Sequence, residues 1–437
     1  DVYKRQGEAG YTYSWTVTGG TIASGQGTGS ITVDWPGAGN GNVSVTGTNA
    51  CGDAEPEDID VIIYYFIESA RSGNFENNST WICNCTPTAT SAIRIMPLHS
   101  VRLIAEESVA LMEIRPAGTL NLNSRNFTVT SDVNIDGVVS GTGTLSLTGN
   151  TKEIDGVGSV QNIGNLSITG GRKTISATAN ISKSNGNVTI ANDITVTNNG
   201  TLTVNGSLTG GNANSRFINA ANATLNVSEA LLSTGTLVSS VSPNTVNYFG
   251  STDQNIFPAT YHHLKASGDG IKLLVAGISI NGDLEISESA SLDVSASDYP
   301  ISIMGNWINT GVDADPFVQR SSTVTFSGSA LQTIEAAAGE TFYNLVINNT
   351  GTAGVTLSGP VTATNQLTLT QGILRLGSAN RIGDTSPVVL NGGTLSTGSA
   401  TGYTDVAGTL MLTENSFIAL GTGAHTLTFA ASSSQAW

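Results

Sequence analysis

Short pairs of apolar residues recur at a nearly constant interval through residues 322–413. The pairs are Val324/Phe326, Leu345/Ile347, Leu367/Leu369, Val388/Leu390 and Leu410/Leu412. The i, i+2 spacing places both side chains of a pair on one face of an extended strand. Strands this short bury apolar surface only when they stack on copies of themselves. Because successive pairs begin about 22 residues apart, the pattern predicts an all-β fold, a right-handed parallel β-helix with one turn per interval.

The same pattern continues toward the N-terminus with more variation. Leu120, Leu145, Leu166 and Val188 follow one another at less regular intervals of the same order. We therefore expect the β-helix to occupy residues 79–437. With about 4.8 Å between adjacent strands, this segment would form about 16 turns and a rod about 75 Å long.

A longer repeat overlies these turns. A glycine, an apolar strand and a closing leucine recur as Gly149/Ile154/Leu166, Gly250/Ile256/Leu264 and Gly328/Ile334/Leu345. Successive closing leucines are separated by about four turns of the predicted helix. We interpret the three groups as copies of one duplicated block, which lengthens a rod without changing its chemistry.

The start of the β-helix carries a tryptophan. The sequence pattern of residues 64–78 is mixed and predicts no single secondary-structure element, so we expect these residues to be a linker. The motifs Gly-Asn-Phe at 73–75 and Ser-Thr-Trp at 79–81, followed by Pro87, resemble the opening turns of β-helices in large bacterial surface proteins. In such proteins a segment bearing the tryptophan caps the first turn. A cap is needed because an uncovered first turn would expose both its core and a strand edge.

Residues 7–63 follow a different pattern. Tyr11, Tyr13, Trp15 and Val17 alternate with polar residues, and further short strands at 31–35, 43–45 and 59–63 are separated by turns rich in Gly and Asn. This pattern predicts a β-sandwich. The segments 13–17, 19–22, 25–28, 31–35 and 48–52 resemble the PKD-like, immunoglobulin-like modules repeated in secreted proteins of Bacteroidetes. The resemblance implies a partial module of this kind in an exported protein.

The first six residues, Asp-Val-Tyr-Lys-Arg-Gln, resemble the translation of a transposase adapter used to prepare sequencing libraries. We therefore interpret the chain as a metagenomic fragment and exclude residues 1–6 from the expected fold. On this interpretation we expect both natural ends to be missing, with the β-helix truncated at its C-terminus.

The composition narrows the class of protein. Charged residues make up 11% of the chain and apolar residues 39%, a fraction too high for disorder. The 17 basic and 33 acidic residues give a net charge of −16, so we expect no nucleic-acid partner. No apolar run approaches the roughly 20 residues that a membrane-spanning helix needs.

The best groupings of carboxylates are Asp132/Asp136, Glu153/Asp155 and Asp313/Asp315. Glycosidases require two carboxyl groups about 5 Å or about 6.5–9.5 Å apart. None of the pairs is accompanied by a suitably spaced basic cluster, and Asp in turns commonly forms local hydrogen bonds. The segment 311–315 suggests Ca²⁺ only weakly, because it lacks the remaining oxygen ligands. We therefore expect no catalytic residues, no cofactor-binding residues and no metal ligands.

The three cysteines do not form a disulfide framework. Cys83 and Cys85 share one face of an extended segment, and His99 is the only other soft metal ligand nearby. A disulfide between residues i and i+2 is strained, so we expect these cysteines to pair with another segment or to remain free. We assign Cys51 to the sandwich, without a partner.

His262 and His263 are the only adjacent histidines. In the longer repeat, His263 stands where another copy has Asn344. This equivalence favours a role in a turn or in a ladder of stacked side chains over catalysis.

Two functions fit these patterns. The first is an extracellular or cell-surface structural or adhesive protein, resembling the large adhesins of Bacteroidetes, whose partners are surface glycans or other extracellular proteins. The alternative is a β-helix protein that binds or degrades polysaccharides. Because aromatic residues are scattered and acidic groups do not converge, we favour the first and expect the chain not to be an enzyme. A solenoid that binds ice would need a stricter threonine array.

Overall fold

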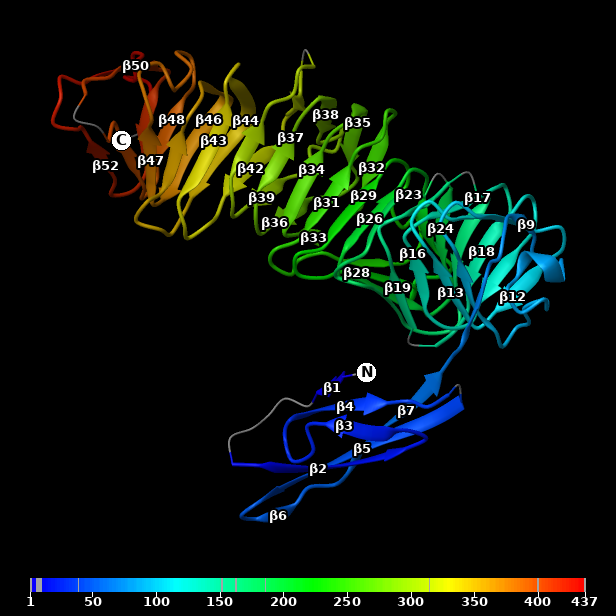
Figure 1. The fold of residues 1–437 in the computed structure, drawn as a ribbon. Coiled ribbons are helices and arrows are strands. Elements are labelled where there is room, and N and C mark those ends of the chain that lie inside the picture. The colour runs from blue at the N-terminus through cyan, green and yellow to red at the C-terminus, as the bar shows by residue number, and fades with distance from the viewer. Residues whose placement is uncertain are drawn as a thin grey trace.

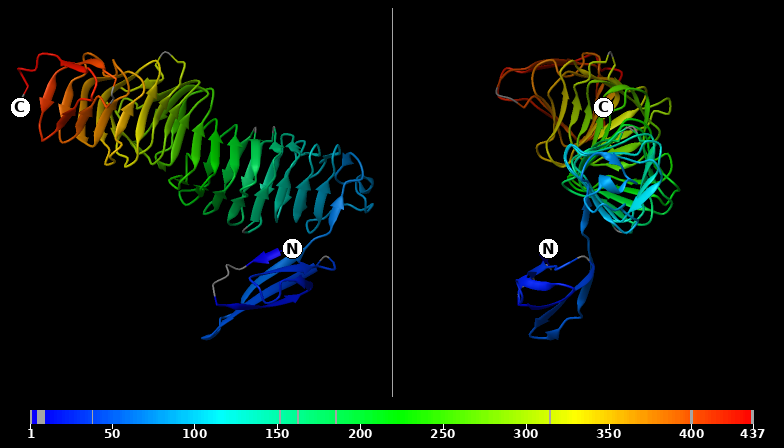
Figure 2. Two further views of the ribbon diagram at one scale, coloured as in Figure 1. Left: turned by 60° about the vertical axis from the view of Figure 1, so that its left-hand side comes forward. Right: turned by 45° about the vertical axis from the view of Figure 1, so that its right-hand side comes forward.

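The computed structural model describes residues 2–4, 10–37, 39–150, 152–161, 163–184, 186–313, 315–398 and 401–435. A small β-sandwich precedes a long parallel β-solenoid, and the solenoid winds as a rod from its cyan first turns to its red last turns (Figures 1 and 2). The solenoid has about 16 turns of roughly 21 residues. The predicted all-β class, the parallel β-helix and its number of turns are confirmed.

The sandwich consists of two antiparallel sheets. One contains β1 (Val2–Lys4), β3 (Thr21–Ser24) and β4 (Ser30–Asp34), and the other contains β2 (Thr12–Thr18), β5 (Gly39–Asn49), β6 (Gly52–Asp53) and β7 (Glu57–Ile63). Alternating apolar residues of β2, β4 and β5 form its small core. The buried residues are Tyr13, Trp15, Ile31, Val33, Val43 and Val45.

The pairing of β1 with β4 corrects one expectation. Residues 1–6 lie outside the expected fold, yet Val2–Lys4 forms a strand antiparallel to Ser30–Asp34. A backbone of any sequence supplies the donors and acceptors of such a ladder, so an unpaired edge at β4 is sufficient to recruit this segment.

Most turns of the solenoid contribute short strands to three faces. Face one contains β8 (Phe66–Glu68), β10 (Ala92–Ile95), β13 (Leu111–Ile114), β16 (Val133–Ile135), β19 (Lys152–Asp155), β22 (Lys173–Ile175), β25 (Thr195–Asn198), β28 (Arg216–Asn219), β30 (Thr236–Val238), β33 (Thr260–Tyr261), β36 (Ile278–Ile280), β39 (Ile301–Ile303), β42 (Thr323–Phe326), β44 (Glu340–Asn348), β46 (Val361–Gln371), β48 (Val388–Leu390) and β51 (Leu410–Leu412). A bridge between Ser239 and Tyr261 joins its two sheets.

Face two runs along the whole rod. It contains β9 (Gly73–Asn74), β11 (Ser100–Arg102), β14 (Thr119–Asn121), β17 (Val138–Ser140), β20 (Ser159–Val160), β23 (Asn180–Ser184), β26 (Thr201–Val204), β29 (Thr224–Val227), β31 (Thr245–Tyr248), β34 (His263–Ala266), β37 (Leu284–Ile286), β40 (Trp307–Asn309), β43 (Gln332–Ala336), β45 (Val355–Leu357), β47 (Ile373–Leu376), β49 (Thr394–Ser396) and β52 (Phe417–Ala419). Strand β23 packs beside β20, which connects the two sheets of this face.

Face three is interrupted in the middle of the rod. Its first sheet contains β12 (Glu107–Val109), β15 (Phe127–Val129), β18 (Thr144–Leu147), β21 (Asn165–Ile168), β24 (Asn187–Ile190) and β27 (Leu208–Gly210), and its second contains β32 (Gln254–Ile256), β35 (Asp269–Leu274), β38 (Ser289–Asp293) and β41 (Phe317–Val318). Between them, Leu231 forms only an isolated bridge to Leu208. In Figure 1 the later turns lie offset from the earlier ones. Near the C-terminus, β50 (Thr404–Ala407) pairs with β53 (Thr426–Phe429).

The core is a set of stacked apolar columns. On face one, Val324, Leu345, Leu367, Val388 and Leu410 are consecutive partners in the parallel register, and all are buried. The predicted column of apolar pairs is therefore confirmed. Each fully buried side chain of this size contributes about 1.5–3 kcal/mol relative to an exposed one.

The first turn begins earlier than expected. The predicted linker, residues 64–78, is mostly part of this turn, because β8 pairs with β10 and β9 pairs with β11. The 3₁₀ helix η1 (Asn78–Thr80) follows. Trp81 is 2% exposed, and its Nε1 donates to the backbone oxygen of buried Phe75 at 2.7 Å. Trp81 thus fills the end of the apolar interior, as expected of the cap.

The interpretation of three duplicated blocks of four turns is wrong. The closing leucines lie on different faces, with Leu166 on face three, Leu264 on face two and Leu345 on face one. A duplication by whole turns would keep them on one face. The recurring element is instead a corner, at which a glycine follows a strand and the chain turns to the next face.

Candidate functional site

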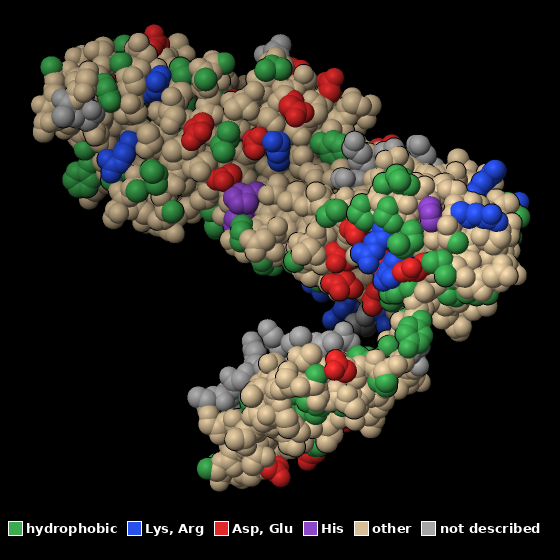
Figure 3. Space-filling view, viewed as in Figure 1, with side chains coloured by type: hydrophobic (Ala, Val, Ile, Leu, Met, Phe, Trp, Pro, Cys, Tyr) green, Lys and Arg blue, Asp and Glu red, His purple; other side chains and the backbone are tan. Residues whose placement is uncertain are grey.

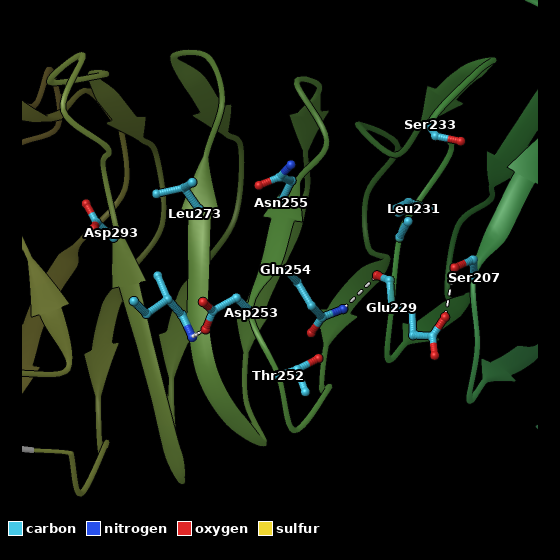
Figure 4. Close-up of a pocket in the computed structure, with 12 residues that line it drawn as sticks. Ser207, Glu229, Leu231, Ser233, Thr252, Asp253, Gln254, Asn255, Leu273 and Asp293 are labelled. Atoms are coloured by element: carbon cyan, nitrogen blue, oxygen red, sulfur yellow. Dashed lines mark hydrogen bonds between the residues drawn. The ribbon is translucent and has the colours of Figure 1, made fainter.

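A groove of about 540 Å³ lies on the outer side of face three, where that face is interrupted (Figure 4). Its walls come from five successive turns, because the segment around Leu231 forms no strand and leaves the surface lower than its neighbours. The lining residues are Ser207, Glu229, Ala230, Leu231, Ser233, Thr252, Asp253, Gln254, Asn255, Ile271, Leu273 and Asp293. Sequence patterns do not indicate this groove, because it results from a missing strand.

The groove is acidic. Ser207 Oγ donates to Glu229 Oε2 at 3.0 Å, and the backbone N–H of Ile271 donates to Asp253 Oδ1 at 2.9 Å. In Figure 4 the Glu229 side chain points toward Ser207. The lining residues include no Lys, Arg, His or aromatic residue. The groove can therefore accept hydroxyl or amine groups of a ligand, and any proton transfer in it would depend on carboxylates.

Lys272 lies beneath this groove and is fully buried. Its Nζ donates to the backbone oxygens of Gly250 and Asp269, at 2.8 and 2.7 Å. Burial lowers the pKa of Lys272 to about 8, although Asp253 and Asp269 oppose that change. The ammonium group of Lys272 therefore satisfies carbonyl oxygens in the interior of the solenoid and does not line the groove.

The structure brings two of the expected carboxylate pairs together. Asp132, Asp136, Glu153 and Asp155 lie at adjacent turns of face one, where acidic and basic side chains gather on the N-terminal turns (Figure 3). Asp132 Oδ1 accepts the backbone N–H of Glu153 at 2.8 Å, and Asp136 Oδ1 accepts that of Val157 at 3.3 Å. These carboxylates bond to backbone amides of the next turn, which favours the turn interpretation.

The third pair occupies the loop after β40. The backbone N–H of Asp315 donates to Asp313 Oδ1 at 3.0 Å, a local turn of the expected kind. Burial raises the pKa of Asp315, and the negative charges of Asp313 and Asp293 raise it further. Asp293 is held by Arg320 through two hydrogen bonds of 2.6 and 2.7 Å.

Glu340 is a buried carboxyl group that sequence reasoning missed. It is 6% exposed and accepts hydrogen bonds from Trp307 Nε1 at 2.7 Å and Asn309 Nδ2 at 2.8 Å. Burial raises the pKa of Glu340 from 4.5 to about 7, and the charge of Asp315 adds to this increase. A signal was present, because Glu340 stands at i−2 from the inward-facing Phe342.

The prediction for Cys83 and Cys85 is wrong, because the two form a disulfide with each other. Asn84 adopts a φ of 52°, and this left-handed turn brings the flanking Cα atoms to 5.1 Å. His99 instead shares a hydrogen bond of 2.8 Å with Ser69 Oγ. Cys51 is free and exposed in the sandwich, as the sequence interpretation placed it.

The histidine pair lies at the corner between β33 and β34. His263 Nδ1 accepts the backbone N–H of Asp283 from the next turn at 2.9 Å and lies 3.4 Å from Asp283 Oδ2. The His263 side chain beside its carboxylate lowers the pKa of Asp283, whereas burial and the neighbouring His263 lower the pKa of His262. These contacts between turns favour the predicted role in a turn or ladder.

The described residues include no group of three or more His, Cys, Asp or Glu side chains placed to hold a metal ion. Among the residues that the structure places, no helical segment has the length and hydrophobicity that crossing a bilayer requires.

Comparison with known proteins identifies only the N-terminal part. Residues 3–61 match the family model of the PKD-like domain. No curated protein and no solved structure matches the chain. The matched residues coincide with the antiparallel sandwich, and the parallel turns follow from Phe66 onward. The chain therefore consists of a PKD-like domain followed by a parallel β-solenoid.

Proposed function

We propose that this chain is part of an extracellular or cell-surface structural and adhesive protein of the type found in Bacteroidetes, in which the solenoid is a stalk without a catalytic site. The observation that carries the proposal is the use of polar side chains to bond one turn to the next along a rod of about 16 turns. Such a rod separates its two ends and presents long flat faces.

A ladder on the outer side of face two illustrates this use. Asn226 Nδ2 donates to Thr203 Oγ1 at 3.1 Å, and Asn247 Nδ2 donates to Asn226 Oδ1 at 3.1 Å. Ser267 Oγ then donates to Asn247 Oδ1 at 2.8 Å. The ladder fixes polar groups at the spacing of the turns, about 4.8 Å. Regular polar groups of this kind support contact with surface glycans or extracellular proteins.

The carboxylates also support a structural role. Asp132 and Asp136 accept backbone N–H groups of the following turn, as does Asp253. A general acid or base needs an oxygen directed at a substrate. The net charge of −16 disfavours nucleic acid as a partner.

The test is adhesion by the full chain. Beads coated with the chain are expected to bind surfaces that carry glycans or extracellular proteins, with and without added Ca²⁺. Beads coated with the PKD-like domain alone control for the contribution of the solenoid. Failure of the coated beads to bind any such surface would contradict the adhesive role.

A second candidate is a protein that binds or degrades polysaccharides, and the acidic groove on face three favours it. Glu229 and Asp253 are the two lining carboxylates that no described basic side chain pairs with in an ion pair. A depolymerisation screen tests this function. Release of soluble oligosaccharides that is lost in Glu229→Gln or Asp253→Asn would replace the structural proposal with an enzyme.

A further inference from the structure

The bridge between Cys83 and Cys85 lies on the surface of the first turn. Cys83 is exposed and Cys85 is half-buried. A thiolate attacks a disulfide at one sulfur and expels the other. Because Cys83 is the more exposed residue of the pair, we expect an incoming thiolate to attack its sulfur, with Cys85 as the leaving thiolate.

The loop that carries the bridge is also held by contacts without sulfur. Trp81 and Pro87, which flank it, are buried. The backbone N–H of Asn84 donates to the oxygen of Trp81 at 3.0 Å, and Thr86 Oγ1 donates to the backbone oxygen of Glu76 at 3.2 Å. A bridge over one residue restricts the unfolded chain less than one that joins distant turns. The first turn therefore keeps its anchors when the bridge opens.

Cys51 supplies a thiol at the other extremity of the N-terminal region. It is free and exposed in the turn between β5 and β6, and its backbone N–H donates to Asn49 Oδ1 at 2.8 Å. Figures 1 and 2 place β6 at the end of the sandwich farthest from the solenoid. Cys51 is therefore remote from the bridge of its own chain, and it meets that bridge only on a second copy.

We propose that Cys51 of one copy forms a disulfide with Cys83 of a second copy by thiol–disulfide exchange. The Cys51 thiolate attacks Cys83 Sγ, and a bond between the two copies forms as the Cys83–Cys85 bond breaks. The electron pair of the broken bond leaves with Cys85 Sγ, which takes up the proton that Cys51 lost. One thiol and one disulfide are present before and after the step, so no oxidant is required.

Each copy then carries one nucleophile and one acceptor at different places. A contact between two different surfaces of identical chains is heterologous, and it forms open chains unless its rotation closes a ring. Covalent chains of this kind would link the sandwich of one copy to the first solenoid turn of the next. Each assembly would then carry the adhesive faces of several stalks. Only this use rests on the proposed function, because the exchange itself is a property of the purified chain.

The experiment is incubation of the purified full chain without oxygen at mildly alkaline pH, a condition commonly used for thiol–disulfide exchange. The chain is then alkylated and examined by electrophoresis without reductant and by mass spectrometry of peptides. We expect a ladder of disulfide-linked species, a linked pair of peptides containing Cys51 and Cys83, and alkylation at Cys85. A chain that stays monomeric, or that links through two Cys51 residues, overturns the proposal.

Two variants separate the nucleophile from the acceptor. Cys51→Ser and the double variant Cys83→Ser/Cys85→Ser should each lose the whole ladder while keeping the circular dichroism spectrum of the unmodified chain. Adding limiting 2-mercaptoethanol to Cys51→Ser should produce a mixed disulfide at Cys83. Attachment at Cys85 instead, or no attachment, contradicts the assigned acceptor. Adhesion of Cys51→Ser beads tests the proposed function independently of the exchange.

Discussion

Two corners of the solenoid, on different faces, each contain a buried glutamine that forms the same set of hydrogen bonds. Gln254 and Gln332 each accept the N–H of the glycine four residues before them and donate to two carbonyl oxygens of the preceding turn. The first belongs to face three and the second to face two. The local sequence therefore determines where a corner forms. The same corner can form on more than one face of the rod.

The two corners differ in the group that lies beside the glutamine. Beside Gln254, the buried ammonium of Lys272 donates to the backbone oxygen of Gly250 at 2.8 Å. Beside Gln332, the buried amide of Asn349 donates to Ala330 O and to Gln332 Oε1, each at 2.8 Å. A cation and a neutral amide thus satisfy the same kind of interior acceptor. Because burying a charge costs free energy, the two corners should respond differently to pH.

The largest effect is expected from removing either glutamine. Gln332→Ala should destabilise its corner by about 3–4 kcal/mol and Gln254→Ala by about 2–3 kcal/mol, because each leaves buried polar groups unpaired. The first value is larger because Asn349 also loses an acceptor. Amide hydrogen exchange at the corner glycines measures both. Gln371→Ala, at an exposed position, is the control, and equal protection in all three variants would contradict the importance of the corners.

Glu340, which follows the second corner, should give the next largest effect. Its folded-state pKa of about 7 lies above the ordinary 4.5, so its stabilisation is complete below pH 4.5 and is lost as pH rises through 7. The free energy of unfolding of the unmodified chain should fall by about 2.5 kcal/mol between pH 5 and pH 8 relative to Glu340→Gln. Fluorescence of Trp307, which donates to this carboxyl group, should titrate near pH 7 only with Glu340 present.

A control for this titration is Glu335→Gln. Glu335 lies on the exposed side of β43, so its removal should leave the Trp307 signal unchanged. Identical pH profiles for Glu340→Gln and the unmodified chain would show that the carboxyl group is not buried in solution.

Lys272 should give a smaller effect of opposite sign at the first corner. Its folded-state pKa of about 8 lies below the ordinary 10.5, so the unfolded chain binds more protons between these values and stability rises with pH there. The unmodified chain should gain about 1–3 kcal/mol from pH 7 to pH 10 relative to Lys272→Met, measured by chemical denaturation. Lys265→Met, which removes a surface partner of Glu285, should show no such gain.

The apolar columns could be predicted because each short strand alternates between inward and outward residues. The i, i+2 spacing at Leu345 and at Leu367 is enough to show that both strands direct their apolar pairs inward. The assignment of faces could not be predicted, because turns vary in length. The step from Trp307 to its partner Ile334 is half as long again as the step from Val246 to its partner Leu264. These differences in turn length accumulate. After a few turns, counting residues therefore no longer identifies the face on which a residue lies.

The disulfide and the buried carboxyl group could not be predicted from the sequence for a second reason. The Cys83–Cys85 bridge depends on the left-handed conformation of Asn84, which composition does not reveal. The burial of Glu340 depends on Trp307 and Asn309, which lie on an earlier turn of the rod. Local patterns give the direction of a side chain, but partners supplied by other turns decide whether it is charged, bonded or free.

The smallest effect is expected on the flat surface between corners. Asn247→Ala breaks two bonds of the ladder on face two, but its neighbours Asn226 and Ser267 lie on the outer side of the face and can bond to water. We expect a loss of about 0.5–1 kcal/mol in the free energy of unfolding, against nearly none for Asn255→Ala at an exposed position. If Asn247→Ala instead cost as much as Gln254→Ala, the outer ladders would hold the turns in register as strongly as the corners do. The hydrogen bonds of the corner glutamines would then be one of several equivalent sets of contacts, and the position of a corner would no longer follow from its glycine and glutamine.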